Sequence, residues 1–125
     1  MNEKELFKGI LNSIPYPIVY VDLEHIIRFM NNAAVYHYST ERGHGSLIGQ
    51  SIFKCHGENK SKEMITRIVE RFKTDAKEKF LQVNDRNLRV YITPVKNDRN
   101  KLIGYYERFE NNFAIDITEK NKGGQ

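Results

Sequence analysis

The order in which helix-like and strand-like patterns follow one another constrains the fold of this chain most. Apolar residues recur at helical spacing within 1–14, and Pro15 and Pro17 end that pattern. Two short runs rich in β-branched and aromatic residues follow at 18–21 and 26–30, joined by a polar turn. Two such runs with a short connection predict an antiparallel hairpin.

Helical patterns occupy the middle of the chain. Asn31 precedes a short apolar run and predicts a helix start, because its side chain can accept a hydrogen bond from a backbone N–H of the first turn. The glycine-containing stretch 39–49 predicts a loop. Ser61 is the expected N-cap of a longer helix, whose predicted buried stripe is Met64, Ile65, Ile68, Val69 and Phe72.

The last third carries three further strand patterns, at 79–83, 88–93 and 102–109, and Pro94 is expected to end the second. The full order is therefore helix, two strands, helices, three strands. One five-stranded antiparallel sheet with helices packed on one face and an N-terminal amphipathic helix is the simplest arrangement. The predicted fold class is α+β.

Composition limits the class of protein. A chain of 125 residues, 39% of them hydrophobic, suits a helix over 1–14, a single core over 15–113 and a polar tail over 114–125. No apolar run approaches the roughly 18 residues of a membrane-spanning helix, and the acidic start is unlike a secretory signal. The net charge of +4 comes from basic residues interleaved with acidic ones, which is typical of a solvated surface. We expect a cytoplasmic protein without a membrane or nucleic-acid partner.

Five short motifs follow one another over most of the chain. They are S-I-P-Y-P-I-V-Y-V-D at 13–22, I-I-R-F-M-N-N-A-A at 26–34, L-I-G-Q-S-I-F at 47–53, L-I-G-Y at 102–105 and D-I-T-E-K at 116–120. In this order they resemble the opening, the second strand with its helix start, the mid-domain segment, the last strand and the D-I-T motif of the PAS (Per-Arnt-Sim) sensory domain. The Cys55-His56 pair resembles a subset of that family.

The resemblance implies a stand-alone module for signal sensing or protein interaction in signal transduction. No enzyme is expected, since the sequence has no Gly-x-Ser-x-Gly motif, no Walker loop and no glycine-rich dinucleotide-binding motif. It also implies a cavity between sheet and helices that can hold a small ligand, whose binding would shift the population of conformations. The candidate cavity residues are Val19, Val21, Ile27, Phe29, His37, Cys55, His56, Met64, Ile68, Val90, Ile92 and Tyr105.

The N-terminal helix is a second candidate surface. About three turns are too short to be stable alone in water, so its apolar stripe must pack on the domain or on another chain. The resemblance implies a homodimer here, together with a signalling partner in trans. A ligand-free homodimerisation or adaptor module is therefore the alternative function. The stripe consists of Leu6, Phe7, Ile10, Leu11 and Ile14.

A haem or redox sensor is a third reading, since either Cys55 or His56 can ligate haem iron. Haem and flavin are not favoured, because the motifs of the haem-binding and flavin-binding branches of the family are missing, and the cofactor stays unknown. The histidines show no spacing typical of a metal hydrolase, and His25 is expected to be solvated in its turn. The acidic residues near the last strand, Glu107, Glu110 and Asp116, form no recognisable acid pair.

Overall fold

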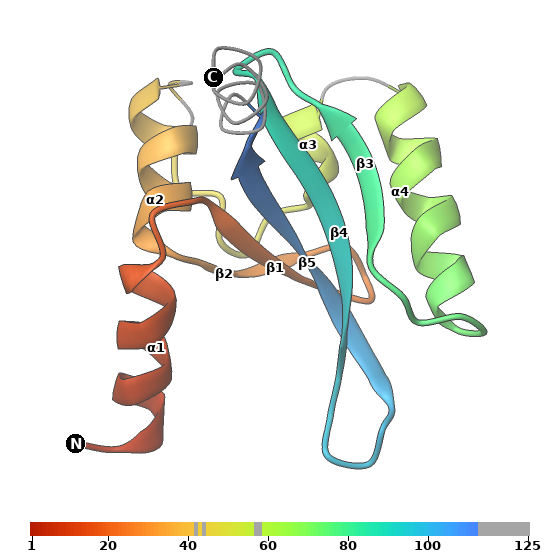
Figure 1. The fold of residues 1–125 in the computed structure, drawn as a ribbon, viewed down its shortest axis with the longest axis horizontal. Helices are drawn as coiled ribbons and strands as arrows, with labels where there is room; N and C mark the ends of the chain where they lie inside the picture. The colour runs from red at the N-terminus through yellow and green to blue at the C-terminus, as the bar shows by residue number, and fades with distance from the viewer. Residues whose placement is uncertain (42, 44, 57–58, 113–125) are drawn as a thin grey trace, which may run out of the picture.

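A five-stranded antiparallel sheet forms the centre of the protein (Figure 1). The computed structural model describes residues 1–41, 43, 45–56 and 59–112. The strands lie in the order β2-β1-β5-β4-β3, so the first and last strands of the chain are neighbours. They are β1 (Ile18–Asp22), β2 (Ile27–Met30), β3 (Lys79–Val83), β4 (Leu88–Lys96) and β5 (Leu102–Asn111).

The helices divide into one that leaves the sheet and a group that covers its inner face. α1 extends away from the sheet at the N-terminus (Figure 1). The covering group packs residues of α2, η1 and α4 into the same core as the strands. The helices are α1 (Glu3–Ser13), α2 (Asn32–Val35), the π-helix η1 (Tyr36–Glu41), α3 (Phe53–His56) and α4 (Asn59–Phe72). The α+β fold class expected from the sequence is confirmed.

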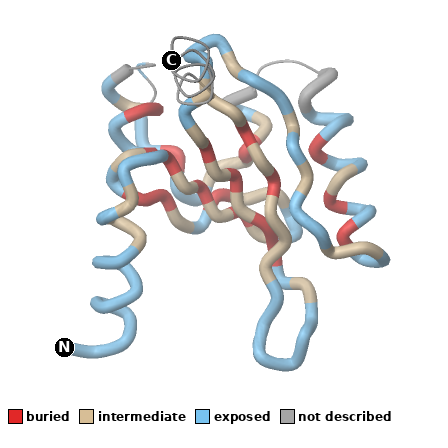
Figure 2. The backbone as a smooth tube through the Cα atoms, viewed as in Figure 1, coloured by how far each residue is buried: buried red, intermediate tan, exposed pale blue. Residues whose placement is uncertain are grey.

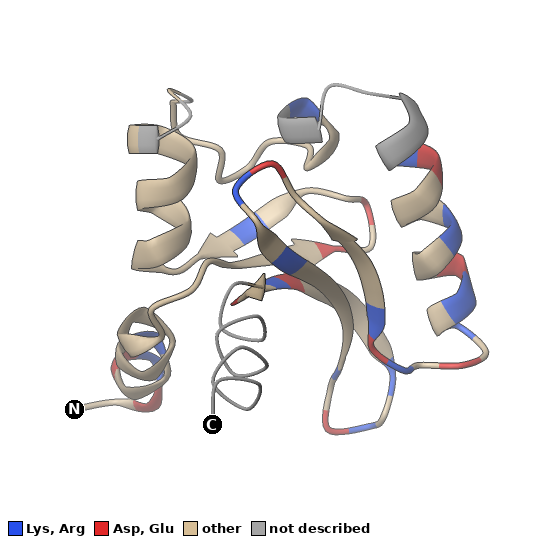
Figure 3. Ribbon diagram, turned by 45° about the horizontal axis from the view of Figure 1, so that its top comes forward, with Lys and Arg blue, Asp and Glu red and all other residues tan. Residues whose placement is uncertain are grey.

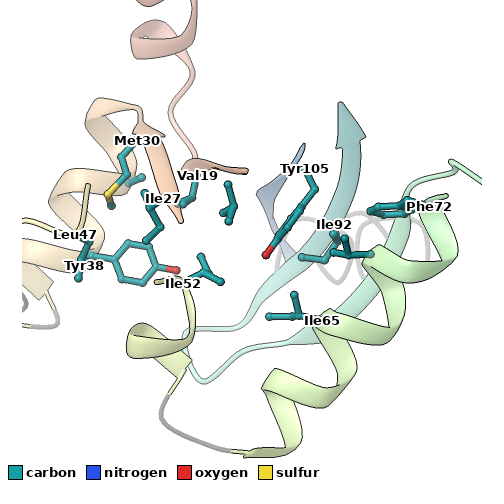
Figure 4. Packing of buried hydrophobic residues seen from close by; sticks show 13 residues of the cluster. Val19, Ile27, Met30, Tyr38, Leu47, Ile52, Ile65, Phe72, Ile92 and Tyr105 are labelled. Atoms are coloured by element: carbon teal, nitrogen blue, oxygen red, sulfur yellow. The ribbon is translucent and has the colours of Figure 1, made fainter. Parts of the chain in front are cut away.

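The hydrophobic core lies between the sheet and these covering helices. Figure 2 shows buried positions along the central strands and on one side of α4. Alternate strand residues and every third or fourth residue of α4 meet in this layer, as their two periodicities require. Figure 4 shows how they pack. The core residues are Val19, Val21, Ile27, Met30, Ala34, Tyr38, Leu47, Ile52, Ile65, Val69, Phe72, Ile92 and Tyr105.

Local signals set most element ends, with two exceptions. Asn31 caps α2 as predicted, since its Oδ1 accepts the N–H of Ala34 at 3.0 Å. Ser61 is not an N-cap, because α4 begins two residues earlier at Asn59. Pro94 does not end β4. The β3–β4 pairing stops at Ile92, so Pro94 lies where β4 has no β3 neighbour and a missing N–H is tolerated.

Charged residues of both signs are interleaved on α1 and α4 (Figure 3). Among the described residues, no helix combines the length and the apolar character needed to cross a lipid bilayer.

Candidate functional site

The inner face of β5 carries a phenol and a carboxylate side by side. Tyr105 and Glu107 are both 0% exposed, and alternation along the strand directs both side chains to the same face. In the sheet they lie opposite Val21 and Val19 of β1, and Ile92 of β4 flanks Glu107. Burying a carboxyl group among aliphatic side chains is costly unless its surroundings compensate for it, so this position is a candidate for function.

The β1–β2 turn brings His25 to Tyr105. Asp22 shapes this turn, since its Oδ1 accepts the backbone N–H of Glu24 at 2.9 Å and of Ile26 at 3.0 Å. His25 has a φ of 66°, and its Nδ1 lies 2.8 Å from Oη of Tyr105. The expectation that His25 is solvated is therefore met only in part, because the turn folds its ring back against β5 and leaves the residue half-buried.

Burial governs the protonation of this pair. It raises the pKa of the Tyr105 phenol, and the nearby carboxylates of Glu107 and Asp22 raise that pKa further. Burial lowers the pKa of the His25 imidazole, and the opposing attraction of the Asp22 carboxylate does not reverse this shift. The pair is thus held as neutral phenol and neutral imidazole at neutral pH, with one donating a hydrogen bond to the other. Figure 4 shows the Tyr105 hydroxyl pointing into the layer between sheet and helices.

His37 lies at the other end of the same face. It is buried in η1, and its ring centroid is 5.8 Å from that of Phe109 and 4.8 Å from that of Tyr38. Phe109 follows Glu107 on the inner face of β5. Glu107 therefore lies between Tyr105, which contacts His25, and Phe109, which contacts His37. We call this group the inner polar cluster and define it as His25, His37, Tyr105 and Glu107.

Most of the predicted cavity residues lie at this inner face. Ile68 is partly buried against the core. The other members of the predicted set found there are buried, namely Val19, Val21, Ile27, His37, Val90, Ile92 and Tyr105.

The prediction of a position in the cavity is wrong for two residues. Met64 is 38% exposed, because its neighbour Ile65 occupies the inward position of α4. Phe29 lies on the outer face opposite Tyr20, where it lines a groove. A register shift in the β1–β2 pair interrupts the alternation along β2, so Phe29 no longer shares a face with Ile27.

Cys55 and His56 belong to α3, but their side chains lie outside the described part of the structure. The polar tail 114–125 with its D-I-T motif also lies outside it. Among the side chains that are described, no group of three or more His, Cys, Asp and Glu is arranged to hold a metal ion.

The outer face of the sheet carries an apolar groove of about 400 Å³ next to α1. No residue of α1 is buried, and Leu6, Phe7 and Ile10 are 42%, 54% and 52% exposed. Two members of the predicted apolar stripe, Leu11 and Ile14, line the groove, so the stripe and the groove adjoin. The groove residues are Leu11, Ile14, Ile18, Tyr20, Phe29 and Tyr106.

A family model described as PAS domain, PAS_10, matches residues 7–112. The chain belongs to the PAS domain family. PAS domains are signal-sensing modules, and the similar structures include a sensory box sensor histidine kinase from Vibrio cholerae. A search of curated protein sequences finds no match.

Solved structures share this PAS fold at low sequence identity. The PAS domain of Bordetella pertussis BvgS has a TM-score of 0.59 and 16% identity, covering 99% of this chain and 100% of that one. A C-terminal domain from Streptococcus mutans has a TM-score of 0.63 and 20% identity, covering 86% and 84%. The Vibrio cholerae Aer2 receptor, described as a dual PAS-heme oxygen sensor, has a TM-score of 0.55 and 17% identity, covering 75% and 91%. At these identities the likeness extends to the fold alone.

The sequence analysis missed Glu107 and His25 as members of the site in this PAS domain. A signal for Glu107 was present, since a period of two places it on one face with Tyr105 and Phe109. Nothing local to the turn indicates that His25 lies against β5, because that contact joins residues 80 positions apart.

Proposed function

We propose that this PAS domain is a signal-sensing module whose input is a small polar molecule bound at the inner polar cluster. The observation that carries this proposal is the pair Tyr105 and Glu107, both fully buried on one face of β5. Apolar residues of similar volume often fill a core at least as stably as buried ionisable groups do. In a pocket, a few convergent polar groups among apolar side chains are typical of a small-molecule site.

The chemistry of the cluster defines the class of ligand. The Tyr105 hydroxyl can donate or accept a hydrogen bond, and the carboxyl oxygens of Glu107 accept. His37 adds an imidazole beside Phe109 at the far end of the face. These groups suit a compact molecule with N–H or O–H donors directed at Glu107 and an apolar body against the aliphatic core.

The test combines release of bound molecules with a thermal-shift screen of metabolites. We expect mass spectrometry of the denatured protein to find a released molecule, or the screen to find one that raises the melting temperature. Glu107→Gln should weaken its binding at least tenfold, and Tyr105→Phe should weaken it independently. Glu110→Gln is the matched control, since Glu110 lies on the same strand and bonds to Arg108 on the other face. Unchanged binding by both cluster variants would exclude this site, and an absorbance spectrum of the same sample tests haem and flavin.

We also propose that the module forms a homodimer through α1 and the adjoining groove. The supporting observation is the half-exposed set Leu6, Phe7 and Ile10 on a helix without a buried residue. A contiguous apolar surface of this kind is typical of a protein interface. In a symmetric pair, each α1 would cover the same surface of the other copy, and the dimer would present the signal to a partner protein.

Light scattering after size exclusion, over a series of protein concentrations, tests the dimer. We expect the double variant Phe7→Ser with Ile10→Ser to be a monomer at concentrations where the wild type is a dimer. Lys4→Ser on the same helix is the control and should remain dimeric. A wild type that is monomeric throughout the series, or a dimeric double variant, would contradict the proposal.

A further inference from the structure

The side chain of Asn31 is 0% exposed. Both ends of its amide form hydrogen bonds with backbone groups. Its Nδ2 donates to carbonyl oxygens at the end of α1 and in the segment that follows. These are the oxygens of Leu11 at 3.0 Å, Ile14 at 3.4 Å and Tyr16 at 3.0 Å. The Leu11 carbonyl also accepts the backbone N–H of Ile14 at 3.3 Å, so Asn31 adds a second donor, from a buried side chain, to the C-terminal end of α1.

The other end of the same amide serves the core. Oδ1 of Asn31 accepts the N–H of Ile18 at 2.9 Å and that of Ala34 at 3.0 Å. The first bond fixes the start of β1, and the second caps α2. One buried side chain therefore links α1, the sheet and the helix that leads into η1 with His37.

The other contacts of α1 lie near the surface. The helix contributes no buried residue. Near Asn31, a second polar bond joins the two segments, since Oδ1 of Asn12 accepts the backbone N–H of Asn32 at 2.9 Å. The attachment of α1 thus combines this buried polar joint at one end with partly exposed apolar contacts. Leu11 and Ile14 line the outer groove, and Phe7 and Leu11 line a second hollow beside Met30 and Ile48.

We propose that Asn31 is the positioning residue that sets the direction of α1 relative to the sheet and so controls how the apolar stripe is presented. The effect of Asn31 on α1 follows from the hydrogen bonds alone. Its consequence for assembly rests on the proposed homodimer, so the test measures the helix and the dimer separately.

The substitution Asn31→Asp distinguishes the role of Nδ2 from that of Oδ1. Aspartate is nearly isosteric and caps a helix as well as asparagine does, so the bonds from Ile18 and Ala34 are retained. An oxygen replaces Nδ2, however, and an ionised carboxylate has no hydrogen to donate to the carbonyl oxygens of Leu11 and Tyr16. The substitution breaks the α1 joint and leaves the α2 cap in place. Asn32→Ala is the matched control, because it changes an exposed neighbour and keeps its backbone bond to Asn12.

Hydrogen exchange of the full chain, followed by mass spectrometry, tests the proposal. We expect Asn31→Asp to speed exchange in α1 at least tenfold, with β5 as protected as in the wild type, and Asn32→Ala to match the wild type. Asn31→Ala provides the same measurement if a buried aspartate prevents folding, with faster exchange expected in both α1 and α2. Exchange in α1 as slow as in the wild type, in whichever of the two variants folds, overturns the proposal.

Protein concentration separates this result from the dimer. A faster exchange of α1 in Asn31→Asp that persists at every dilution supports a joint within one chain, even if the wild type is a monomer. Exchange in α1 that depends on dilution, with no difference between Asn31→Asp and the wild type, overturns the positioning role and leaves the dimer standing. Where the wild type dimerises, we expect Asn31→Asp to raise the dimer dissociation constant at least fivefold.

Discussion

Replacing Tyr105 with phenylalanine isolates the hydrogen bond between the inner sheet and the β1–β2 turn. The ring remains in its buried position, and only Oη, 2.8 Å from Nδ1 of His25, is removed. A protein hydrogen bond contributes about 0.5–1.5 kcal/mol net to stability. His25 is half-buried and can recover part of the loss through water, so we expect the free energy of unfolding to fall by about 1 kcal/mol.

Urea unfolding followed by circular dichroism at pH 8 measures this loss, which corresponds to about 4 °C in melting temperature for a domain of this size. A double-mutant cycle with His25→Asn assigns it to the pair. Asparagine suits the positive φ at this position but is too short to reach Oη. Tyr106→Phe is the matched control, because Tyr106 lies on the same strand and lines the outer groove.

Two results would refute this reasoning. One is a Tyr105→Phe protein as stable as the wild type, which would mean that the hydrogen bond makes no net contribution to the free energy of unfolding. The other is simple addition of the two single losses in the double variant, which would mean that Tyr105 and His25 stabilise the fold independently.

Three further expectations follow from burial. The pKa of His25 in the folded protein lies below its ordinary value of 6.5. The stability that neutral His25 contributes is therefore complete above about pH 6.5 and is lost as the pH falls through the folded pKa. Urea unfolding between pH 8 and pH 5 should show this loss of stability in the wild type and a smaller loss in His25→Asn. Gly104→Ala should lower the free energy of unfolding by about 1–3 kcal/mol, because its Cβ would clash with the backbone oxygen of Val21, and an unchanged midpoint would argue against this packing. Ile65→Ala should cost about 2–5 kcal/mol, while Met64→Ala next to it costs less than about 1 kcal/mol, and similar losses for the two would contradict the orientation of α4.

Local pattern carries much of the fold. The strand over 79–83, the helix ended by Pro15 and the Asn31 cap were all predictable, because each depends on residues within a few positions of one another. The predictions failed where a neighbour in space decided the outcome. Pro94 continues a strand because β3 no longer lies beside it there. Phe29 changes face because the pairing with β1 shifts register.

The candidate site divides in the same way. Periodicity indicates that Tyr105 and Glu107 share a face of their strand, but it does not indicate whether that face meets the helices or the solvent. The apolar stripe of α1 was also evident from the sequence. Whether that stripe is buried or exposed in the single chain was not.

The sequence by itself determined where most strands and helices lie and, where the pairing is regular, which residues share a face, since these depend on local propensity and spacing. Tertiary structure alone decided that β1 lies beside β5, which brings His25 to Tyr105 across 80 positions of chain. It also decided that one buried amide, Asn31, holds the end of α1. Both depend on strand order and on hydrogen bonds between distant segments, and no local pattern in a sequence encodes such contacts.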